Sequence, residues 1–397
     1  MKPEIRIATI GNVDSAKSTT ISVLANKILD NGRGEARKLI LKHPHESNTG
    51  RTSSITQHFI ETDQSIIGFV DLAGHEKYLK TTMTGLNGCF IDYCIVTIGA
   101  DRGIIGMTKE HLSIAVALKI PLIIVITKID IAKNHKLEKI KSNLNKLLSH
   151  KLLNNKKKIY VNNENIEKID LNENIPIFEI SNVTGYNISL LRNFIHNLPK
   201  NDKILNTINV NNNSIFKIDD RFKIKGIGIV LSGVVENGII SIGDKLYLGP
   251  FKDGTFKEVI IKNIHNNFRQ NVNELRNGQG GCFNIKPVFK KKILDINSIK
   301  LGQILIKKPF SIKKFKAKVT ILHHPTTIKI NYQSVIHCGT VKQSAKICNM
   351  DKELIRTGDS AIVTFEFLFH PVYMQKNSKI IFREGKTKGI GKVLEIN

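Results

Sequence analysis

The N-terminal half of the chain alternates between short apolar runs and longer segments that have apolar residues at helical spacing. The apolar runs have the length of buried strands and lie at residues 4–10, 66–70, 94–98, 122–127 and 177–181. The helical spacing occurs at residues 17–29, 108–118, 135–153 and 187–197. Strands that alternate with helices predict an α/β domain with a mainly parallel sheet, and we expect this domain to end near residue 200.

Two polar segments interrupt this pattern. Residues 30–62 contain Gly, His, Ser and Thr without a clear period, so we expect a long loop there. Long loops in compact domains are commonly functional. Residues 201–213 are rich in Asn and predict a linker after the α/β domain.

The rest of the chain has the texture of β structure. From residue 215 onward, short alternating runs are broken by glycines, as in a β-barrel. A second β segment begins near residue 312 and contains strand-like runs at 315–322 and 361–369. We therefore predict an α/β domain at residues 1–200 followed by two β-barrel domains at 214–308 and 312–397.

The loop after the first strand has the spacing of a phosphate-binding P-loop, which is Gly, four residues, Gly-Lys and then Ser or Thr. Gly11 opens the loop and Lys17 and Ser18 close it, with Ala16 in place of the second Gly. Backbone N–H groups at a helix N-terminus would hold the phosphates, Lys17 would neutralise them, and the Ser18 hydroxyl would ligate Mg²⁺. The predicted binding residues are Gly11, Asn12, Val13, Asp14, Ser15, Ala16, Lys17, Ser18 and Thr19.

A second motif, Asp71-Leu-Ala-Gly74, ends the strand at residues 66–70 and is followed by His75. The Asp71 carboxylate can hold Mg²⁺ through water, and the Gly74 N–H can meet a γ-phosphate. An imidazole at position 75 would orient the attacking water of a hydrolysis reaction. We predict His75 and Lys17 as catalytic residues.

Two further motifs predict that the bound base is guanine. Asp130 follows the strand at residues 122–127 and would accept hydrogen bonds from guanine N1–H and its exocyclic amine, a pair that adenine lacks. The stem of Lys128 would lie along the base, whereas Thr127 occupies the position usual for Asn and lacks its amide. Backbone N–H groups at Ser181 and Asn182 would face guanine O6. All these motifs end strands, at the edge where α/β sheets bind ligands, and together they predict a GTPase that uses GTP, GDP and Mg²⁺.

Composition bears on partners and location. Sixty Lys and Arg against 34 Asp and Glu give a formal charge of +26, which favours a polyanionic partner such as RNA. The abundance of Lys, Asn and Ile is also what an AT-rich coding region would produce, so composition alone leaves both explanations open. The five cysteines have no CxxC spacing and are expected to be buried free thiols. No apolar run is long enough to span a membrane and no signal peptide is recognisable, so we expect a monomeric cytoplasmic protein.

The chain resembles the translational GTPases of the elongation factor Tu type, and within them the group of GTP-binding proteins 1 and 2. The segments that carry the resemblance include GNVDSAKST (11–19), LDNGRGEARK (29–38), DLAGHEKYLKTT (71–82), LHHPTTI (322–328) and FREGKTKGIG (382–391). The resemblance implies a GTP-binding domain with two β-barrels and GTP hydrolysis coupled to a conformational switch. It also implies partners among tRNA, the ribosome and RNA-surveillance factors. Longer family members have an N-terminal extension, which we expect this chain to lack.

The resemblance also implies roles for single residues. Asp14 corresponds to a loop aspartate that helps to hold a monovalent cation near the phosphates, and Val13 to an apolar gate beside the catalytic His. Thr52 or Ser54 corresponds to the switch I hydroxyl that ligates Mg²⁺, and aligning the preceding Arg favours Ser54. His75 corresponds to the catalytic His.

Two alternatives to an active translational GTPase stay open at this point. Ala16 and Thr127 both touch the nucleotide and depart from the usual residues, which is compatible with a nucleotide-gated or catalytically weak adaptor for RNA or ribosome-rescue factors. The other alternative is a metabolic GTPase subunit of the same fold. Measurement of GTP turnover with and without ribosomes distinguishes the adaptor from an active translational GTPase.

Overall fold

The computed structural model describes residues 2–40, 55–149, 156–201, 213–288, 294–385 and 387–396. They form two compact units, of which the first is Met1–Leu86 with Ile91–Asn201 and the second is Asn87–Phe90 with Asp202–Asn397. The two units are described separately below.

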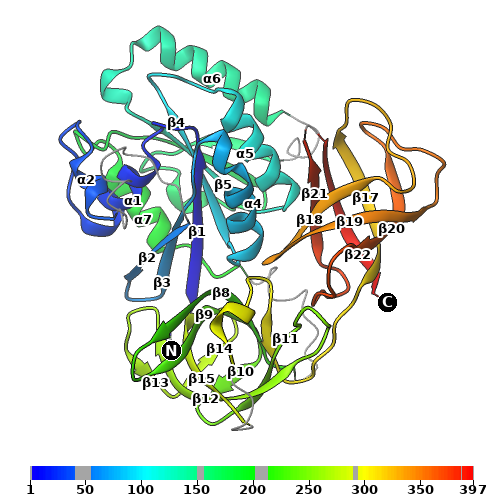
Figure 1. The fold of residues 1–397 in the computed structure, drawn as a ribbon. Coiled ribbons are helices and arrows are strands. Elements are labelled where there is room, and N and C mark those ends of the chain that lie inside the picture. The colour runs from blue at the N-terminus through cyan, green and yellow to red at the C-terminus, as the bar shows by residue number, and fades with distance from the viewer. Residues whose placement is uncertain are drawn as a thin grey trace. The chain divides into compact units, whose positions relative to one another are not determined.

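The first unit is built on a sheet with the strand order β2-β3-β1-β4-β5-β7-β6, of which Figure 1 labels β1 to β5. Its strands are β1 (Glu4–Gly11), β2 (Thr56–Glu61), β3 (Ile66–Asp71), β4 (Tyr93–Gly99), β5 (Leu122–Thr127), β6 (Lys157–Tyr160) and β7 (Asn174–Glu179). Neighbouring strands are parallel except β2 and β3, which are antiparallel. The helices are α1 (Lys17–Asn26), α2 (Glu35–Lys38), α4 (Leu79–Gly88), α5 (Gly106–Ala117), α6 (Asn134–Leu148) and α7 (Ile188–His196), with 3₁₀ turns η1 (Glu76–Tyr78), η2 (Ile129–Ile131) and η3 (Ile166–Lys168).

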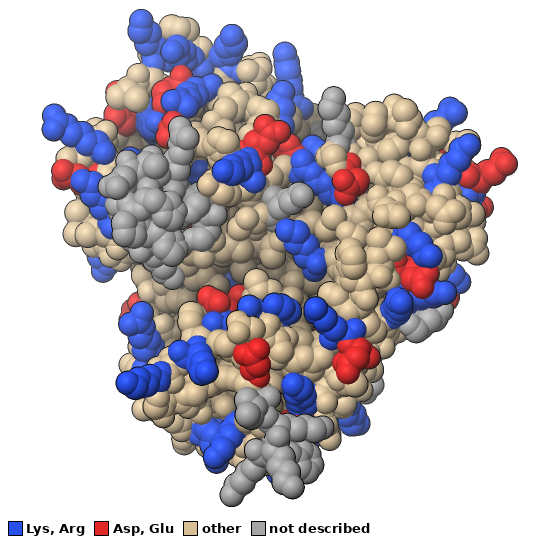
Figure 2. Space-filling view, in the orientation of Figure 1, with Lys and Arg blue, Asp and Glu red and all other residues tan. Residues whose placement is uncertain are grey.

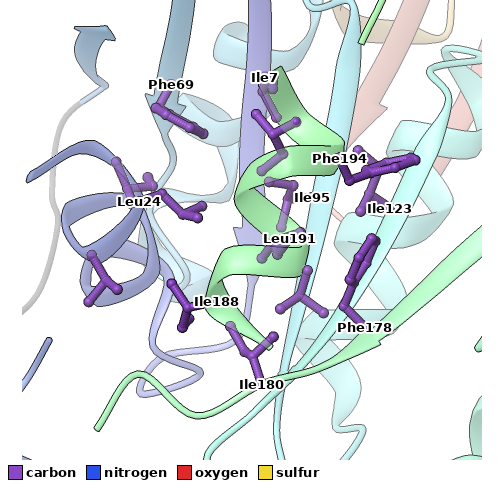
Figure 3. Packing of buried hydrophobic residues seen from close by; sticks show 14 of the residues in the cluster. Ile7, Leu24, Phe69, Ile95, Ile123, Phe178, Ile180, Ile188, Leu191 and Phe194 are labelled. Carbon is purple, nitrogen blue, oxygen red and sulfur yellow. The ribbon is translucent and has the colours of Figure 1, made fainter. Parts of the chain in front are cut away.

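Strand β1 has apolar side chains on both of its faces, and each face is covered by packed residues. All eight residues of β1 are buried, as expected for a parallel strand covered on two sides. On one face, Ile7 belongs to a core that includes Leu191 and Phe194 of α7 (Figure 3). Ala8 and Ile10 alternate with Ile7 and are buried on the opposite face, where α5 packs against β1 and β4. This packing holds the end of β1, and thus the loop after it, in place.

The second unit contains two closed barrels. The first consists of β8 (Ile215–Ile224), β9 (Gly228–Asn237), β11 (Lys245–Gly249), β12 (Lys257–Asn266), β15 (Gly280–Pro287) and β16 (Ile304–Ile306), with β13 (Asn271–Val272) paired to β12 and a separate pair of β10 (Ile239–Ser241) and β14 (Glu274–Arg276). The second consists of β17 (Lys314–His323), β18 (Gln333–Cys338), β19 (Val341–Met350), β20 (Ser360–Phe367), β21 (Lys379–Glu384) and β22 (Thr387–Ile396). Each barrel encloses its own apolar core. The predicted fold class, an α/β domain followed by two β-barrels, is confirmed.

Several local predictions differ from the structure. The expected loop at residues 30–62 contains α2 and the edge strand β2, whose mostly half-exposed polar residues hide the strand pattern. The helix expected at 17–29 ends at Asn26, because Lys27 adopts φ 58° and its N–H donates to the Val23 carbonyl at 3.1 Å. Strand β6 was not predicted. Most of the expected linker lies outside the described residues, and the division into three domains stays a prediction because the two barrels share one compact unit.

Two predictions from composition can be compared with the structure. None of the described helices is both long and apolar enough to cross a membrane. All five cysteines are thiols that form no disulfide: Cys89, Cys94 and Cys338 are buried as predicted, whereas Cys282 and Cys348 are half-buried. Burial raises the pKa of the Cys338 thiol to about 11, so this thiol stays protonated and unreactive at neutral pH.

Candidate functional site

The predicted motifs converge on one edge of the seven-stranded sheet. The strands β1, β3, β5 and β7 are parallel members of this sheet, and a motif follows the C-terminal end of each. Carboxyl ends of parallel strands share an edge, so residues far apart in sequence meet there. The loop after β4 reaches the same edge, although no function was predicted for it.

The loop after β1 is held in an unusual backbone conformation. Gly11 has φ 146°, and a Cβ added to it would lie 2.5 Å from the Thr97 carbonyl oxygen, so only glycine fits. The Ser15 hydroxyl lies 2.8 Å from the Asn12 carbonyl and 2.7 Å from the Thr97 hydroxyl, which ties the loop to β4. Helix α1 begins directly after Ala16, which provides no side-chain cap. The first N–H groups of α1 are therefore suited to an anion.

Ala16, where the P-loop pattern has Gly, adopts φ 62° and ψ 27°. This is the left-handed region, in which the Cβ of an L-residue is crowded by the backbone. Asp14 also has φ 62°, but Asp tolerates this conformation better than Ala. The substitution of Gly by Ala thus carries a backbone cost at this position.

Lys17 is buried next to the loop, with an exposed fraction of 7%. Its ammonium donates to the Asn12 carbonyl at 2.7 Å. Burial lowers the pKa of Lys17 to about 8, and the carboxylates of Asp71 and Asp14 oppose this shift. An anionic ligand at the loop would further favour the charged form.

Gly74 packs against this lysine. A Cβ at position 74 would clash with the Lys17 ammonium and would lie 2.8 Å from the Gly11 carbonyl oxygen. The Asp71-Leu-Ala-Gly74 turn therefore lies in contact with the phosphate-binding loop, which brings the first two motifs together.

Ser18 and Asp71 offer adjacent oxygen donors. The Ser18 hydroxyl donates to Asp71 Oδ2 at 2.5 Å, and Asp71 is 1% exposed. A hydroxyl beside a buried carboxylate at a phosphate-binding loop fits the oxygen preference of Mg²⁺. The other predicted ligand, Ser54 or Thr52, lies outside the described residues.

His75 is exposed at the start of the 3₁₀ turn η1. Its Nδ1 accepts a hydrogen bond from the Lys77 N–H at 3.1 Å, and its ring meets the Tyr78 ring edge-on with centroids 6.2 Å apart. A neutral imidazole whose Nδ1 is an acceptor carries its proton on Nε2. The backbone bond therefore selects one tautomer of His75.

Thr127 connects the β5 motif to the phosphate-binding loop. It is fully buried and its hydroxyl donates to the Ser15 carbonyl at 3.1 Å. The Thr127 hydroxyl thus makes a hydrogen bond to the phosphate-binding loop, although Thr lacks the side-chain amide of the Asn that is usual at this position. Lys128 follows with φ 60°, and its ammonium lies 2.8 Å from Asp101 Oδ2. Asp130 is exposed in η2, where its carboxylate is accessible to a ligand.

Ser181 and Asn182 are both buried, with exposed fractions of 0% and 5%. The Asn182 amide donates to the Thr20 hydroxyl at 3.0 Å and so ties this motif to α1. The Ser181 N–H donates to the Tyr186 carbonyl, and the Ser181 hydroxyl accepts the N–H groups of Val183 and Thr184. The N–H groups of Ser181, Val183 and Thr184 therefore already have partners within the turn. The predicted contact with guanine O6 then requires the Asn182 N–H, or a change in the hydrogen bonds of the turn.

Two charged residues at this edge were missed. Asp101 pairs with Lys128, and Arg102 lies 3.1 Å from Asp14 Oδ2 in the phosphate-binding loop. Both residues follow the predicted strand at 94–98. They are therefore expected at the same sheet edge as the other motifs, because the carboxyl ends of parallel strands share that edge. A search of every strand end for charged residues would have found them.

His111 of α5 was also missed. It is fully buried, and both of its ring nitrogens are enclosed close to the Gly11 backbone. Burial, reinforced by the nearby charge of Lys17, lowers the pKa of His111 from 6.5 to about 4. The imidazole therefore stays neutral under the phosphate-binding loop at physiological pH.

This histidine predicts a pH dependence of folding stability. Below pH 6.5 the unfolded chain protonates His111, whereas the folded chain resists protonation until about pH 4. Folding stability is thus lost as the pH falls, by about 2 kcal/mol between pH 7.5 and pH 5 for this group. Urea denaturation of the wild type and His111→Gln across this range measures the difference. Equal pH slopes for the two proteins would contradict the prediction.

Comparisons with known proteins show which family the chain is similar to. Residues 2–200 match the family described as "Elongation factor Tu GTP binding domain", and residues 308–397 match "Elongation factor Tu C-terminal domain". GTP-binding protein 1 of Xenopus laevis is 37% identical over 99% of this chain and 63% of its own length. GTP-binding protein 2 of Homo sapiens is 33% identical over 99% of this chain and 69% of its own length.

A solved structure shows the same fold. The crystal structure of a bacterial selenocysteine-specific elongation factor superposes with a TM-score of 0.73 at 22% identity. The match covers 99% of this chain and 58% of that chain. The present chain thus spans about three fifths of the length of that factor and of the Xenopus laevis relative.

Proposed function

Because this chain belongs to the translational GTPase family of the elongation factor Tu type, we propose that it binds GTP and GDP and hydrolyses GTP as a molecular switch. The observation that carries the proposal is the convergence of the phosphate-binding loop, the Ser18–Asp71 pair and the Thr127–Asp130 segment on one sheet edge. The phosphate-binding loop matches the phosphates and the Thr127–Asp130 segment the guanine base in charge and hydrogen-bonding capacity, while the Ser18–Asp71 pair matches the Mg²⁺ ion that accompanies the phosphates.

The phosphates are bound by the phosphate-binding loop after β1. N–H groups at the start of α1 and the Lys17 ammonium bind the phosphate oxygens, and the N–H of Gly74, which packs against Lys17, meets the γ-phosphate. Ser18, Asp71 through water, and Ser54 or Thr52 would hold Mg²⁺, which when bound neutralises charge on the phosphates. Asp130 and Lys128 select guanine, and the buried Thr127 hydroxyl holds their loop against Ser15.

His75 orients the attacking water by donating a hydrogen bond from Nε2–H to the water oxygen, while the Lys77 N–H occupies Nδ1. Hydrolysis without a partner is slow, because positioning of water requires the switch segments to be ordered. The partner is RNA-containing, with the ribosome or tRNA as the first candidates. The formal charge of +26 supports this proposal, and Lys and Arg side chains are spread over the visible face in Figure 2.

The proposal is tested by nucleotide competition and turnover. A fluorescent GDP analogue should be displaced by GDP and not by ADP, and ribosomes should increase the rate of GTP hydrolysis. Guanine binding without turnover, with or without ribosomes, would favour the second candidate, a nucleotide-gated adaptor for RNA or rescue factors. The left-handed Ala16 supports this candidate, since it adds a backbone cost in the proposed phosphate-binding loop.

Replacement of Ala16 by Gly is expected to tighten GTP binding. Relief of the left-handed conformation amounts to roughly 1–2 kcal/mol, or about a tenfold change if it is expressed entirely in affinity. Titration of both proteins with a fluorescent GTP analogue measures the change, and thermal unfolding with bound nucleotide detects any part expressed as stability. Weaker binding by the Gly variant would show that the loop has adapted to the methyl group.

A further inference from the structure

The loop after β4 contacts both halves of the candidate nucleotide site. Its backbone is tightly turned, with the Gly103 N–H donating to the Gly99 carbonyl at 2.7 Å, and the Ala100 N–H donates to the Thr127 carbonyl at 2.9 Å. Two successive side chains then point to different loops. Asp101 pairs with Lys128 beside the base-recognition segment, and Arg102 pairs with Asp14 in the phosphate-binding loop.

The carboxylate of Asp14 presents an electrostatic problem for a loop that binds phosphate. A negative side chain among the phosphate-binding residues repels a polyanionic ligand unless a cation compensates it. The family resemblance assigns this compensation to a free monovalent cation near Asp14. In this chain the Arg102 guanidinium already lies 3.1 Å from Asp14 Oδ2, so the carboxylate does not fit a free cation as its principal ligand.

We infer that Arg102 compensates the charge of Asp14 in place of a monovalent cation and makes nucleotide binding independent of K⁺. This inference rests on the proposed function. A guanidinium is suited to the role because it stays charged at any physiological pH and binds carboxylates with a fixed geometry. It is also pre-positioned, because the Asp101–Lys128 pair and the turn at Gly103 hold the loop that carries it.

The solvent exposure of the Arg102–Asp14 pair helps to distinguish charge compensation from a role in folding stability. The side chains of Arg102 and Asp14 are 55% and 40% exposed, and an exposed ion pair adds little to folding stability. Arg102→Ala should therefore fold like the wild type. A change in nucleotide affinity, and above all its recovery by an added cation, then reports on charge compensation.

The test compares GDP affinity in KCl and in N-methyl-D-glucamine chloride at equal ionic strength and fixed Mg²⁺. The wild type should bind GDP equally in both salts. Arg102→Ala should lose roughly tenfold in affinity without K⁺, because the uncompensated Asp14 carboxylate then repels the phosphates across a largely aqueous dielectric, and recover most of it in KCl. Lys109→Ala removes one exposed positive charge from nearby α5 and is the matched control, with no K⁺ dependence expected.

A double-mutant cycle isolates the pair. In an Asp14→Asn background, where the amide tolerates the left-handed backbone, Arg102→Ala should have little effect in either salt. Wild-type binding that requires K⁺, an Arg102→Ala variant that binds normally without K⁺, or a loss that K⁺ does not restore would each overturn the inference. A wild type that binds no guanine nucleotide in either salt would contradict the proposed function, and this inference with it.

Discussion

Replacement of His75 by alanine is expected to lower the ribosome-stimulated rate of GTP hydrolysis by roughly 10²–10⁴-fold and to leave GDP affinity nearly unchanged. The imidazole follows Gly74, which contacts Lys17, and its Nδ1 is occupied by the Lys77 N–H at 3.1 Å. Its Nε2 is therefore the nitrogen available to a water near the γ-phosphate. Because GDP lacks that phosphate, loss of the ring should affect turnover and not GDP binding.

Single-turnover release of phosphate, measured with and without ribosomes, checks this result. His75→Gln should retain part of the activity, since an amide can also orient water. His135→Ala, an exposed histidine of α6, is the matched control and should behave as the wild type. An unchanged stimulated rate in His75→Ala would remove His75 from the mechanism and favour the adaptor hypothesis.

The second large effect is expected at Asp130. Replacement by asparagine should weaken GDP binding by roughly 10²–10⁴-fold, because two hydrogen bonds to a carboxylate contribute about 1.5–3 kcal/mol each. The same variant should gain affinity for xanthosine diphosphate, since an amide can donate to the carbonyl that replaces the guanine amine. Asp130 is suited to this role because it is exposed in η2 while the neighbouring Lys128 is held by Asp101 at 2.8 Å.

Competition titrations with guanosine, xanthosine and adenosine diphosphates measure the change in specificity. Asp63→Asn alters an exposed carboxylate elsewhere in the same unit and serves as the control for the loss of one negative charge. Equal guanine affinity in wild type and Asp130→Asn would exclude the proposed base recognition. Loss of guanine binding without any gain for xanthine would instead indicate a structural defect, which circular dichroism detects.

The sequence by itself determined the order of the elements and the identity of the main motifs. Buried parallel strands are continuous apolar runs and barrel strands alternate around glycines, so their positions are visible in local patterns. The motifs at Gly11, Asp71, Thr127 and Ser181 could be assigned to one site because each follows a predicted strand. The edge strand β2 and the short β6 were missed because their half-exposed, polar residues carry little periodic signal.

Only the tertiary structure decided how these motifs contact one another. Pairing of Arg102 with Asp14 and burial of His111 beside Lys17 join residues that are 88 and 94 positions apart in the chain, respectively. Local periodicity carries no information about such distances. The left-handed backbone of Ala16 is likewise imposed by its surroundings, because alanine by itself avoids this conformation. Charge balance and strain at the site thus depend on the packed sheet edge, which brings these residues together.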